Sequence, residues 1–385
     1  GRLKNQVTSE NWTSGRIVRI DTVGRTLYFE GHGQVEGGNP YYARLNRVNL
    51  DGKGKIKMLT PEEGNHKVTF SPSGRYIIDT YSRPDQAPRN VVRDVSGKLL
   101  FTLERPDLNN LYAEGWREPE CFTVKAADEE TDLYGVMWKP MDFDSTKRYP
   151  VIAYVYPGPW TEYIPLDFEF SSPSGAPQLA QLGFVVVCFG NRGGSPYRGR
   201  DYHCYGYGNL RDYPLADCKF AIEQLADRYA YIDRDRVGIY GHSGGGMMAA
   251  AAILTYPDFF KVAVAASGNY DNNIYTKWWG EMYHGVKMKV KKDADGIKKY
   301  IFESKIPTIM ELAANLKGKL LLVTGDMDIN VHPANTFRLA NALIKADKLF
   351  DMMVIPGADH SIDSPYYFNL LRHYFAEHLL GGAIE

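Results

Sequence analysis

Apolar and polar residues alternate in two different ways along this chain, and the change falls near residue 105. Before it, short runs of β-branched and aromatic residues are interrupted by Gly, Asn, Asp and Pro without a helical period, which is typical of short strands joined by turns. After it, continuous apolar runs alternate with segments whose apolar residues recur every three or four positions. That alternation predicts a mostly parallel sheet with helices on both faces.

The first segment contains an internal repeat. The residues Gly-Arg-Thr-Leu-Tyr-Phe at 24–29 are echoed by Gly-Arg-Tyr-Ile-Ile at 74–78, and a second pair of strand-like runs follows each copy. A repeat of about 50 residues with roughly four short strands is typical of a β-propeller blade. About two blades fit into residues 1–110, fewer than a closed propeller needs. We therefore interpret the chain as the C-terminal part of a longer protein; a small independent β domain is the alternative.

Residues 111–385 are predicted to form a separate α/β domain. A hairpin is expected within 120–139. Strands are then expected at 149–156, 184–189, 237–240, 262–266, 320–324 and 351–355. Helices are expected at 176–182, 210–229, 247–254, 273–284, 333–344 and 365–379. Because active sites in such sheets lie beyond the carboxyl ends of the strands, the loops after the strands are the places to search for chemistry.

The loop after the strand at 237–240 contains Gly-His-Ser-Gly-Gly, with Ser243 at its centre. This is the Gly-x-Ser-x-Gly pattern of a nucleophile elbow, in which a sharp strand-to-helix turn exposes a serine hydroxyl and bulky neighbours would clash. The glycine-rich turn of an ordinary strand–helix connection, capped by a serine, is the alternative. His242, inside the same motif, is expected to be a packed residue.

A serine nucleophile needs a base within hydrogen-bonding distance, and the base needs an acid to orient it. His360 follows the last predicted strand, and Asp326 and Asp328 follow the strand before it. The order Ser, Asp, His is that of α/β-hydrolases and predicts a serine hydrolase. The pattern of residues leaves both aspartates open as the acid.

Two further groups of residues are candidates for the site. The backbone N–H of Gly244 is expected to donate to an oxyanion, and Tyr156, at the end of an earlier strand, either donates from its hydroxyl or packs in the core. Tyr275, Trp279 and Tyr283 are spaced four apart and are expected to share one face of a helix. That face either lines an apolar substrate pocket or packs in the core.

Composition excludes several other functions. The net charge of −1 provides no electrostatic attraction to nucleic acid or to a membrane surface, and no apolar run approaches the ~18 residues of a membrane span. Cys188 and Cys218 lie in apolar patterns and are expected to be core thiols. The Cys and His residues lack metal-ligand spacing, and we expect neither a metal nor a cofactor.

Several motifs in this order resemble the prolyl oligopeptidase family of serine peptidases, and specifically its dipeptidyl peptidase IV branch. They are VYPGP at 155–159, GNRGG at 190–194, GHSGGG at 241–246, YTKWWGEMYHG at 275–285, GDMDINVH at 325–332 and GADHSI at 357–362. The resemblance covers nearly the whole chain. It implies final propeller blades followed by a complete α/β-hydrolase domain.

The resemblance also implies roles for single residues. Ser243 would be the nucleophile, Asp328 the orienting acid and His360 the base, with Tyr156 and Gly244 forming the oxyanion hole. Tyr275 and Trp279 would line the pocket for the residue before the scissile bond, and Asn330 would bind a substrate carbonyl.

Three departures from the branch bear on substrate selection. Gly244 stands where the closest mammalian members carry tyrosine, and Trp279 stands where dipeptidyl peptidase IV has tyrosine. The paired glutamates that bind a substrate's free amino end come, in that branch, from an earlier propeller segment than this chain contains.

The sequence therefore predicts a serine peptidase that acts on peptide substrates, as a dipeptidyl- or related aminopeptidase preferring proline or alanine before the cut. The alternatives are a carboxylesterase, a prolyl oligopeptidase-type endopeptidase and a non-catalytic interaction protein. Analogy with the family adds a homodimer and a periplasmic or extracytoplasmic location as expectations.

Overall fold

The computed structural model describes residues 1–169, 174–292 and 294–382. The chain divides into two compact units. They are the N-terminal unit and a second unit that carries the residues predicted to be catalytic, called here the catalytic unit. The N-terminal unit comprises residues 1–121 together with two short later segments, which include Asp167 and Tyr202.

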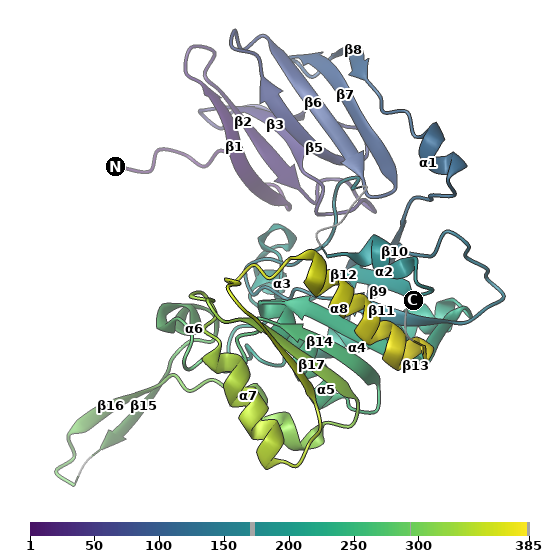
Figure 1. Ribbon diagram of the computed structural model, residues 1–385. Helices are drawn as coiled ribbons and strands as arrows, with labels where there is room; N and C mark the ends of the chain where they lie inside the picture. Colours follow the sequence, from purple (N-terminus) through teal and green to yellow (C-terminus); the bar gives the residue numbers. More distant parts are fainter. Residues whose placement is uncertain (170–173, 293, 383–385) are drawn as a thin grey trace. The chain divides into compact units, whose positions relative to one another are not determined.

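The N-terminal unit contains two four-stranded antiparallel sheets (Figure 1). The first sheet consists of β1 (Thr13–Asp21), β2 (Thr26–His32), β3 (Arg44–Asn49) and β4 (Lys57–Met58). The second consists of β5 (Asn65–Phe70), β6 (Tyr76–Arg83), β7 (Gln86–Asp94) and β8 (Leu99–Glu104), and the short helix α1 (Asn109–Ala113) follows it. Each sheet is an up-and-down meander built on one copy of the repeat, which confirms the predicted pair of blades.

Polar groups join the strands of the second sheet in its interior. The Asp79 carboxylate accepts hydrogen bonds from His66 Nδ1 and from Arg93 Nε, both at 2.8 Å, and all three side chains are buried. One residue comes from each of β5, β6 and β7. Because a buried charge is tolerated only when it is paired, this cluster determines how the three strands align.

The catalytic unit is built on an eight-stranded sheet in the order β18-β17-β14-β13-β11-β12-β10-β9. Its strands are β9 (Glu120–Lys125), β10 (Asp132–Trp138), β11 (Tyr149–Tyr154), β12 (Val185–Phe189), β13 (Ile232–His242), β14 (Phe260–Ala266), β17 (Lys319–Gly325) and β18 (Asp351–Ile355). The six strands from β18 to β12 are parallel, and β10 is antiparallel to β12. This is the predicted α/β-hydrolase sheet. All five residues of β12 are buried, as expected for a strand covered on both faces.

Helices cover both faces of this sheet (Figure 1). On one face, α2 (Ala176–Ala180) and α8 (Pro365–Phe375) pack in the apolar core with the inward side chains of the strands. On the other face lie α4 (Leu215–Arg228), α5 (Gly244–Thr255) and α7 (Ala334–Lys345). The shorter elements are η1 (Pro196–Arg198), α3 (Arg200–His203), α6 (Lys277–Tyr283), η2 (Ile309–Asn315) and η3 (Ala376–Leu380).

Two predicted helices begin later than the sequence pattern indicates. The helix expected at 210–229 is α4, which begins at Leu215, because Pro214 occupies its N-cap and the preceding residues form turns. Leu210 is buried against Ile306 rather than along a helix face. The helix expected at 273–284 is α6, and its first residues are held in a turn by the Asp271 carboxylate, which accepts the backbone N–H of Asn273 at 3.0 Å.

A two-stranded hairpin was not predicted. It is formed by β15 (Lys287–Lys292) and β16 (Lys298–Glu303), which lie between α6 and η2. Cys188 and Cys218 are both buried thiols, as predicted. Within the part of the chain that the structure describes, no helix has the length and apolar character needed to cross a membrane.

Candidate active site

Ser243 lies between β13 and α5 in a strained backbone conformation. Its φ is 57° and its ψ is −121°, a region that residues with a side chain rarely adopt. The Ser243 N–H donates to the Ala266 carbonyl at 2.8 Å, so the turn is attached to the neighbouring strand β14. This is the geometry of the predicted nucleophile elbow, which presents the hydroxyl at the end of the sheet.

The glycines around Ser243 are required by close approach of backbones. A Cβ atom at Gly245 would lie 2.1 Å from the Val155 carbonyl oxygen, and one at Gly246 would lie 2.2 Å from the Ala266 carbonyl oxygen. Both carbonyls are backbone groups at the ends of strands, since Val155 directly follows β11 and Ala266 is the last residue of β14. Gly244 is different, since a Cβ there would meet nothing closer than 3.4 Å.

His360 connects the serine to an aspartate. Its Nε2 lies 3.0 Å from Ser243 Oγ, and its Nδ1 lies 2.8 Å from Asp328 Oδ2. The Asp328 side chain is buried, and its other oxygen accepts the backbone N–H groups of Asn330 and Val331 at 2.9 and 2.8 Å. The carboxylate is thus fixed by its own loop while one oxygen faces the imidazole.

Asp326 does not contact His360. It is exposed, and its Oδ1 accepts the backbone N–H of Gly357 at 2.6 Å. This bond joins the loop after β17 to the loop after β18, the loop that carries the histidine. The geometry therefore separates the two aspartates that the residue pattern left open.

His242 packs beside the candidate base, as expected of a structural residue. The centroids of the His242 and His360 rings lie 4.7 Å apart. Burial, reinforced by the neighbouring His360, lowers the pKa of His242 to about 4. At neutral pH His242 is therefore uncharged and adds no positive charge beside His360.

Tyr156 faces the serine rather than the core. Its hydroxyl is within hydrogen-bonding reach of the Ser243 side chain, and burial, together with the nearby Tyr275, raises its pKa, so the phenol keeps its proton. The loop that follows is held by Tyr213, whose hydroxyl donates to the Pro157 carbonyl at 2.8 Å. Tyr156 is therefore positioned as a hydrogen-bond donor beside Ser243.

A pocket of about 110 Å³ opens beside the serine. It is lined by Tyr156, Gly158, Trp160, Ser243, Gly244, Asn269, Tyr275, Trp279, Asn330 and Val331. Six of the eight predicted site residues line this pocket. The other two are His360, which contacts Ser243, and Asp328, which contacts His360. Trp160 was not predicted; its position four residues after Tyr156, in a loop at the end of a strand, is the signal that was available.

The aromatic residues near α6 divide between pocket and core. Tyr275 precedes the helix, yet its ring contacts that of Trp279 at a centroid distance of 5.3 Å. The Tyr275 hydroxyl donates to Asn330 Oδ1 at 2.8 Å. Trp279 and Tyr283 also pack against a small apolar cluster that contains Leu210. Trp279 thus lines the pocket and also packs against the cluster, whereas Tyr283 packs against the cluster.

Among the residues that the structure describes, no group of three His, Cys, Asp or Glu side chains has the geometry of a metal site. The chemistry available to the pocket is that of the serine, its imidazole neighbour and the donors beside them. Such an arrangement suits nucleophilic acyl transfer.

Both parts of the chain are similar to known protein families. Residues 170–380 match the model of the prolyl oligopeptidase family, and residues 1–88 match that of the dipeptidyl peptidase IV N-terminal region. Human dipeptidyl peptidase 8 is 28% identical over 97% of this chain and 42% of its own length. The chain therefore spans less than half the length of that relative.

Two solved structures share the fold. A Bacteroides ovatus protein described as a dipeptidyl aminopeptidase IV superposes with a TM-score of 0.82 at 28% identity, over 97% of this chain and 51% of that one. Porphyromonas gingivalis dipeptidyl peptidase 4 superposes with a TM-score of 0.81 at 25% identity, over 98% and 51%. Both extend well beyond the matched region.

The steric difference between Gly245 and its neighbour is testable. We expect Gly245→Ala to destabilise the catalytic unit by about 1–3 kcal/mol or more, because its Cβ must displace the Val155 carbonyl. The control is Gly244→Ala, which has room and should change stability by less than about 1 kcal/mol. Urea unfolding followed by tryptophan fluorescence measures both. Equal destabilisation by the two variants would contradict this account of the elbow.

Proposed function

Because the chain belongs to the prolyl oligopeptidase family of serine peptidases, we propose that it hydrolyses peptide bonds by acyl transfer through Ser243, Asp328 and His360. One observation carries the proposal. Hydrogen bonds connect Asp328 through both ring nitrogens of His360 to Ser243 Oγ, and Ser243 lines a pocket.

The first half of the reaction forms an acyl-enzyme. Ser243 Oγ attacks the peptide carbonyl carbon while His360 Nε2 takes the hydroxyl proton. Asp328 holds the imidazole with Nε2 toward the serine and stabilises the imidazolium. The tetrahedral intermediate then loses its C–N bond, and His360 returns the proton to the leaving amine. In the second half of the reaction, water attacks the carbonyl carbon of the acyl-enzyme with His360 again as base, which releases the carboxylic acid and free Ser243.

The negative oxygen of the tetrahedral intermediate needs donors that are already in place. The Gly244 N–H, at the start of α5, is one candidate, and the helix dipole favours negative charge there. The Tyr156 hydroxyl is the other, because it faces Ser243 and burial keeps it protonated. The open space around Gly244 leaves its N–H accessible to the substrate.

The pocket favours a compact residue before the scissile bond. Its walls are the rings of Tyr156, Trp160, Tyr275 and Trp279, and its volume is small. Aromatic walls suit the flat, apolar ring of proline or the methyl group of alanine. The Asn330 amide is adjacent and is proposed to bind a substrate carbonyl.

The relatives are named dipeptidyl peptidases, which supports removal of dipeptides from a free amino end. Homodimerisation and an extracytoplasmic location stay predictions.

The roles of the three residues give distinct kinetic effects. Ser243→Ala should lower kcat by roughly 10⁶-fold, and Asp328→Ala by roughly 10⁴-fold. Asp326→Ala is the matched control, because its carboxylate accepts the Gly357 N–H whereas Asp328 contacts His360, and it should retain activity within about tenfold. Steady-state kinetics on a dipeptidyl chromogenic substrate measures all three. A larger loss in Asp326→Ala than in Asp328→Ala would reverse the assignment of the acid.

Removal of one hydroxyl tests the oxyanion donor. Tyr156→Phe should lower kcat by roughly 10²–10³-fold with little change in KM, since the donor acts on charge that develops only in the transition state. Tyr366→Phe, an exposed tyrosine, is the control and should be unaffected. An unchanged kcat in Tyr156→Phe would show that Tyr156 contributes packing alone.

Paired substrates test the proposed specificity. Gly-Pro p-nitroanilide should be cleaved with a kcat/KM at least about tenfold above that of Gly-Leu p-nitroanilide, because the branched leucine side chain exceeds the pocket. Acetylation of the Gly-Pro amino group should abolish cleavage when the protein assayed also contains the propeller segment from which, by the resemblance, the paired glutamates come. Equal cleavage of the blocked substrate would favour an endopeptidase. Hydrolysis of short esters with no measurable peptide cleavage would favour a carboxylesterase.

A further inference from the structure

A second cavity, of about 220 Å³, adjoins the nucleophile elbow. The described residues that line it are all different from those that line the pocket beside Ser243. It lies between the ends of β11 and β13 and the first turn of α8, because Tyr154, Tyr240 and Tyr367 line it (Figure 1). His242 lines this cavity, whereas the next residue, Ser243, lines the pocket. The two residues therefore face different spaces, and the reaction proposed above uses one of them.

Four of the residues that line the cavity are aromatic. Tyr154 and Tyr240 are paired across β11 and β13, with ring centroids 5.0 Å apart and ring planes inclined at 54°. Tyr367 and Phe368, from α8, have ring centroids 5.5 Å apart and ring planes inclined at 56°. Inclined rings from the sheet and from a helix thus border one space. Proteins recognise organic cations among rings arranged in this way.

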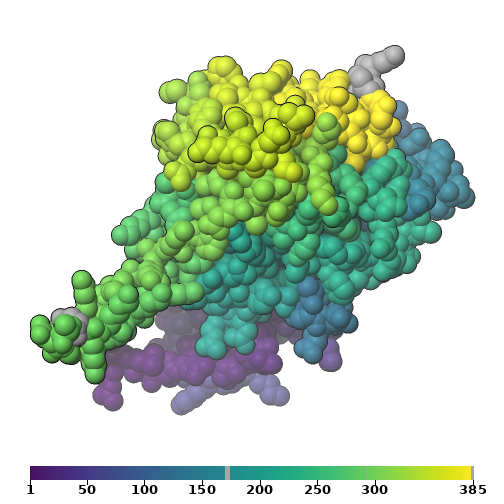
Figure 2. All heavy atoms as spheres, turned by 90° about the horizontal axis from the view of Figure 1, so that it is seen from below, coloured from purple at the N-terminus to yellow at the C-terminus, as the bar shows by residue number. Residues whose placement is uncertain are grey.

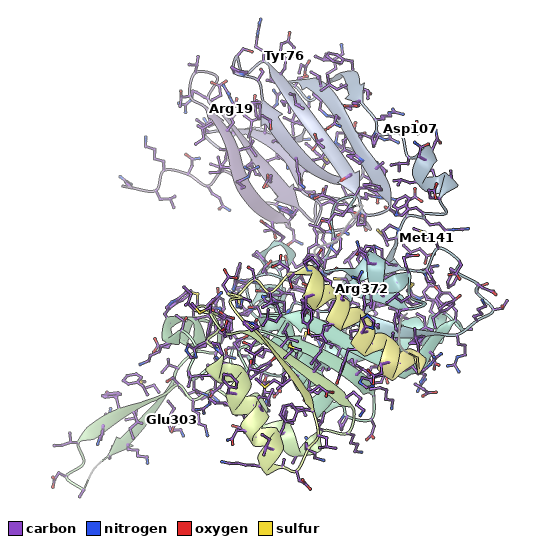
Figure 3. All side chains as sticks on the ribbon, viewed as in Figure 1. Arg19, Tyr76, Asp107, Met141, Glu303 and Arg372 are labelled. Carbon is purple, nitrogen blue, oxygen red and sulfur yellow. The ribbon has the colours of Figure 1, made fainter. Side chains whose placement is uncertain are left out.

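The charge on the cavity wall is negative. Among the described residues that line the cavity, only Asp363 is charged at neutral pH, and it is exposed. Burial and the neighbouring His360 lower the pKa of His242 to about 4, although Asp328 and Asp363 favour its charged form. His242 therefore does not neutralise the carboxylate, and no ion pair joins Asp363 to another described residue. Arg372, labelled in Figure 3, lines a different cavity.

Two polar side chains of the wall are available to a ligand. Neither the Tyr154 hydroxyl nor the His242 ring has a hydrogen-bond partner among the residues that the structure describes. Tyr240 differs, because its hydroxyl donates to the Ser174 carbonyl at 3.0 Å. Polar groups in such places are normally satisfied by water or by a ligand, so the cavity offers hydrogen bonds as well as aromatic surface.

We propose that this cavity binds a small alkylammonium ion, with its positive charge among the aromatic rings and beside the Asp363 carboxylate. The ring faces attract the cation, and the carboxylate adds a charge of opposite sign. A hydroxyl on the ion would reach Tyr154 or His242. Choline, which carries a trimethylammonium group and one hydroxyl, is the probe that matches both features.

The wall excludes other classes of small ligand. An anion would meet a carboxylate and no basic side chain among the described residues that line the cavity. A bare metal ion needs several oxygen or nitrogen ligands, and these walls offer one carboxylate and one imidazole. The volume also suits the proposed ion, because a cavity of roughly 150 Å³ already holds a molecule as large as benzene.

An ion in this cavity would act on the proposed catalytic base. His242 lines the cavity, and its ring centroid lies 4.7 Å from that of His360. Since His360 becomes positively charged when it takes the Ser243 proton, a cation behind His242 opposes that step. The bound ion should therefore lower kcat and leave KM unchanged. This consequence rests on the proposed function, whereas the binding itself does not.

Saturation-transfer NMR on the methyl signal of choline tests the binding. Choline should bind this chain at least tenfold more tightly than 3,3-dimethyl-1-butanol, a neutral molecule of the same shape in which carbon replaces nitrogen. The reason is that the rings and the carboxylate recognise charge. Absence of saturation transfer to choline at 20 mM, or equal binding of the two molecules, would overturn the proposal.

Two substitutions and a control place the ion in the cavity. Asp363→Asn and Phe368→Leu should each weaken choline binding more than threefold. Glu303→Gln is the matched control, because it removes a carboxylate from the hairpin of β15 and β16, which projects from the catalytic unit (Figures 1 and 2; Glu303 is labelled in Figure 3). It should change the affinity less than twofold. Wild-type affinity in Asp363→Asn would overturn the proposal.

The pocket beside Ser243 also has aromatic walls, so it has to be excluded as the site. Tyr275→Leu alters that pocket and not the second cavity, and it should leave the affinity for choline within twofold. A large loss in Tyr275→Leu, without one in Asp363→Asn, would place the ion in the substrate pocket and overturn the proposal.

Kinetics on Gly-Pro p-nitroanilide tests the effect on the base. Saturating choline should lower kcat at least twofold with KM within twofold, and Asp363→Asn should remove this inhibition. Competitive inhibition would contradict the proposal, because it places the ion in the substrate pocket. A chain that binds choline through Asp363 but cleaves no peptide would contradict the proposed function and support the second site.

Discussion

The carbonyl oxygens of Val155 and Ala266 leave no room for side chains where α5 begins, and the rest of the site depends on this close approach. Because glycine occupies 245 and 246, the helix lies directly against the ends of β11 and β14. The chain then has to turn sharply at Ser243, in a conformation that costs free energy. The residues of α5 before its last turn are buried, and that packing holds the turn in place. Contacts between backbones therefore determine the direction of the Ser243 hydroxyl, independently of the side chains of His360 and Asp328.

The partners of Ser243 depend on a second constraint, the alignment of two loops at neighbouring strand ends. The Asp326 carboxylate binds Gly357, and the Met327 N–H donates to the Ala358 carbonyl at 3.0 Å, so the loops after β17 and β18 move as one piece. Asp328 and His360 belong to that piece. The two aspartates thus have separate roles, since Asp326 aligns the loops and Asp328 contacts the ring that the alignment presents. The contact between Asp328 and His360 therefore depends on a few hydrogen bonds between two neighbouring loops.

Sequence reasoning succeeded where the signal is local or follows chain order. The elbow, the strand ends and the order of Ser243 and His360 were all recognisable, because each depends on a few adjacent residues. The choice between Asp326 and Asp328 was not determined by the residue pattern, since both follow the same strand and only the path of the loop separates them. Trp160 was missed because a loop without a periodic pattern gives no indication of which way its side chain points. The hairpin was missed although lysines alternate with apolar residues in it, because the alternation predicts a strand without naming the partner that it packs against.

The Ser243–His360–Asp328 group and the aromatic rings of the pocket come from different parts of the catalytic unit. Ser243, Asp328 and His360 lie at the ends of three strands of one sheet, β13, β17 and β18, and the bonds between the last two loops align the acid with the imidazole. Tyr275 and Trp279 instead belong to an insertion between β14 and β17, which is held by the turn at Asp271 and by the Asn273 side chain. The aromatic residues on such a segment can be replaced by larger or smaller ones without moving Ser243. Trp279, for example, stands where the resemblance implies a tyrosine. The hairpin of β15 and β16 extends from the same insertion, beyond the two hydrogen bonds that join Asn273 to Ile306.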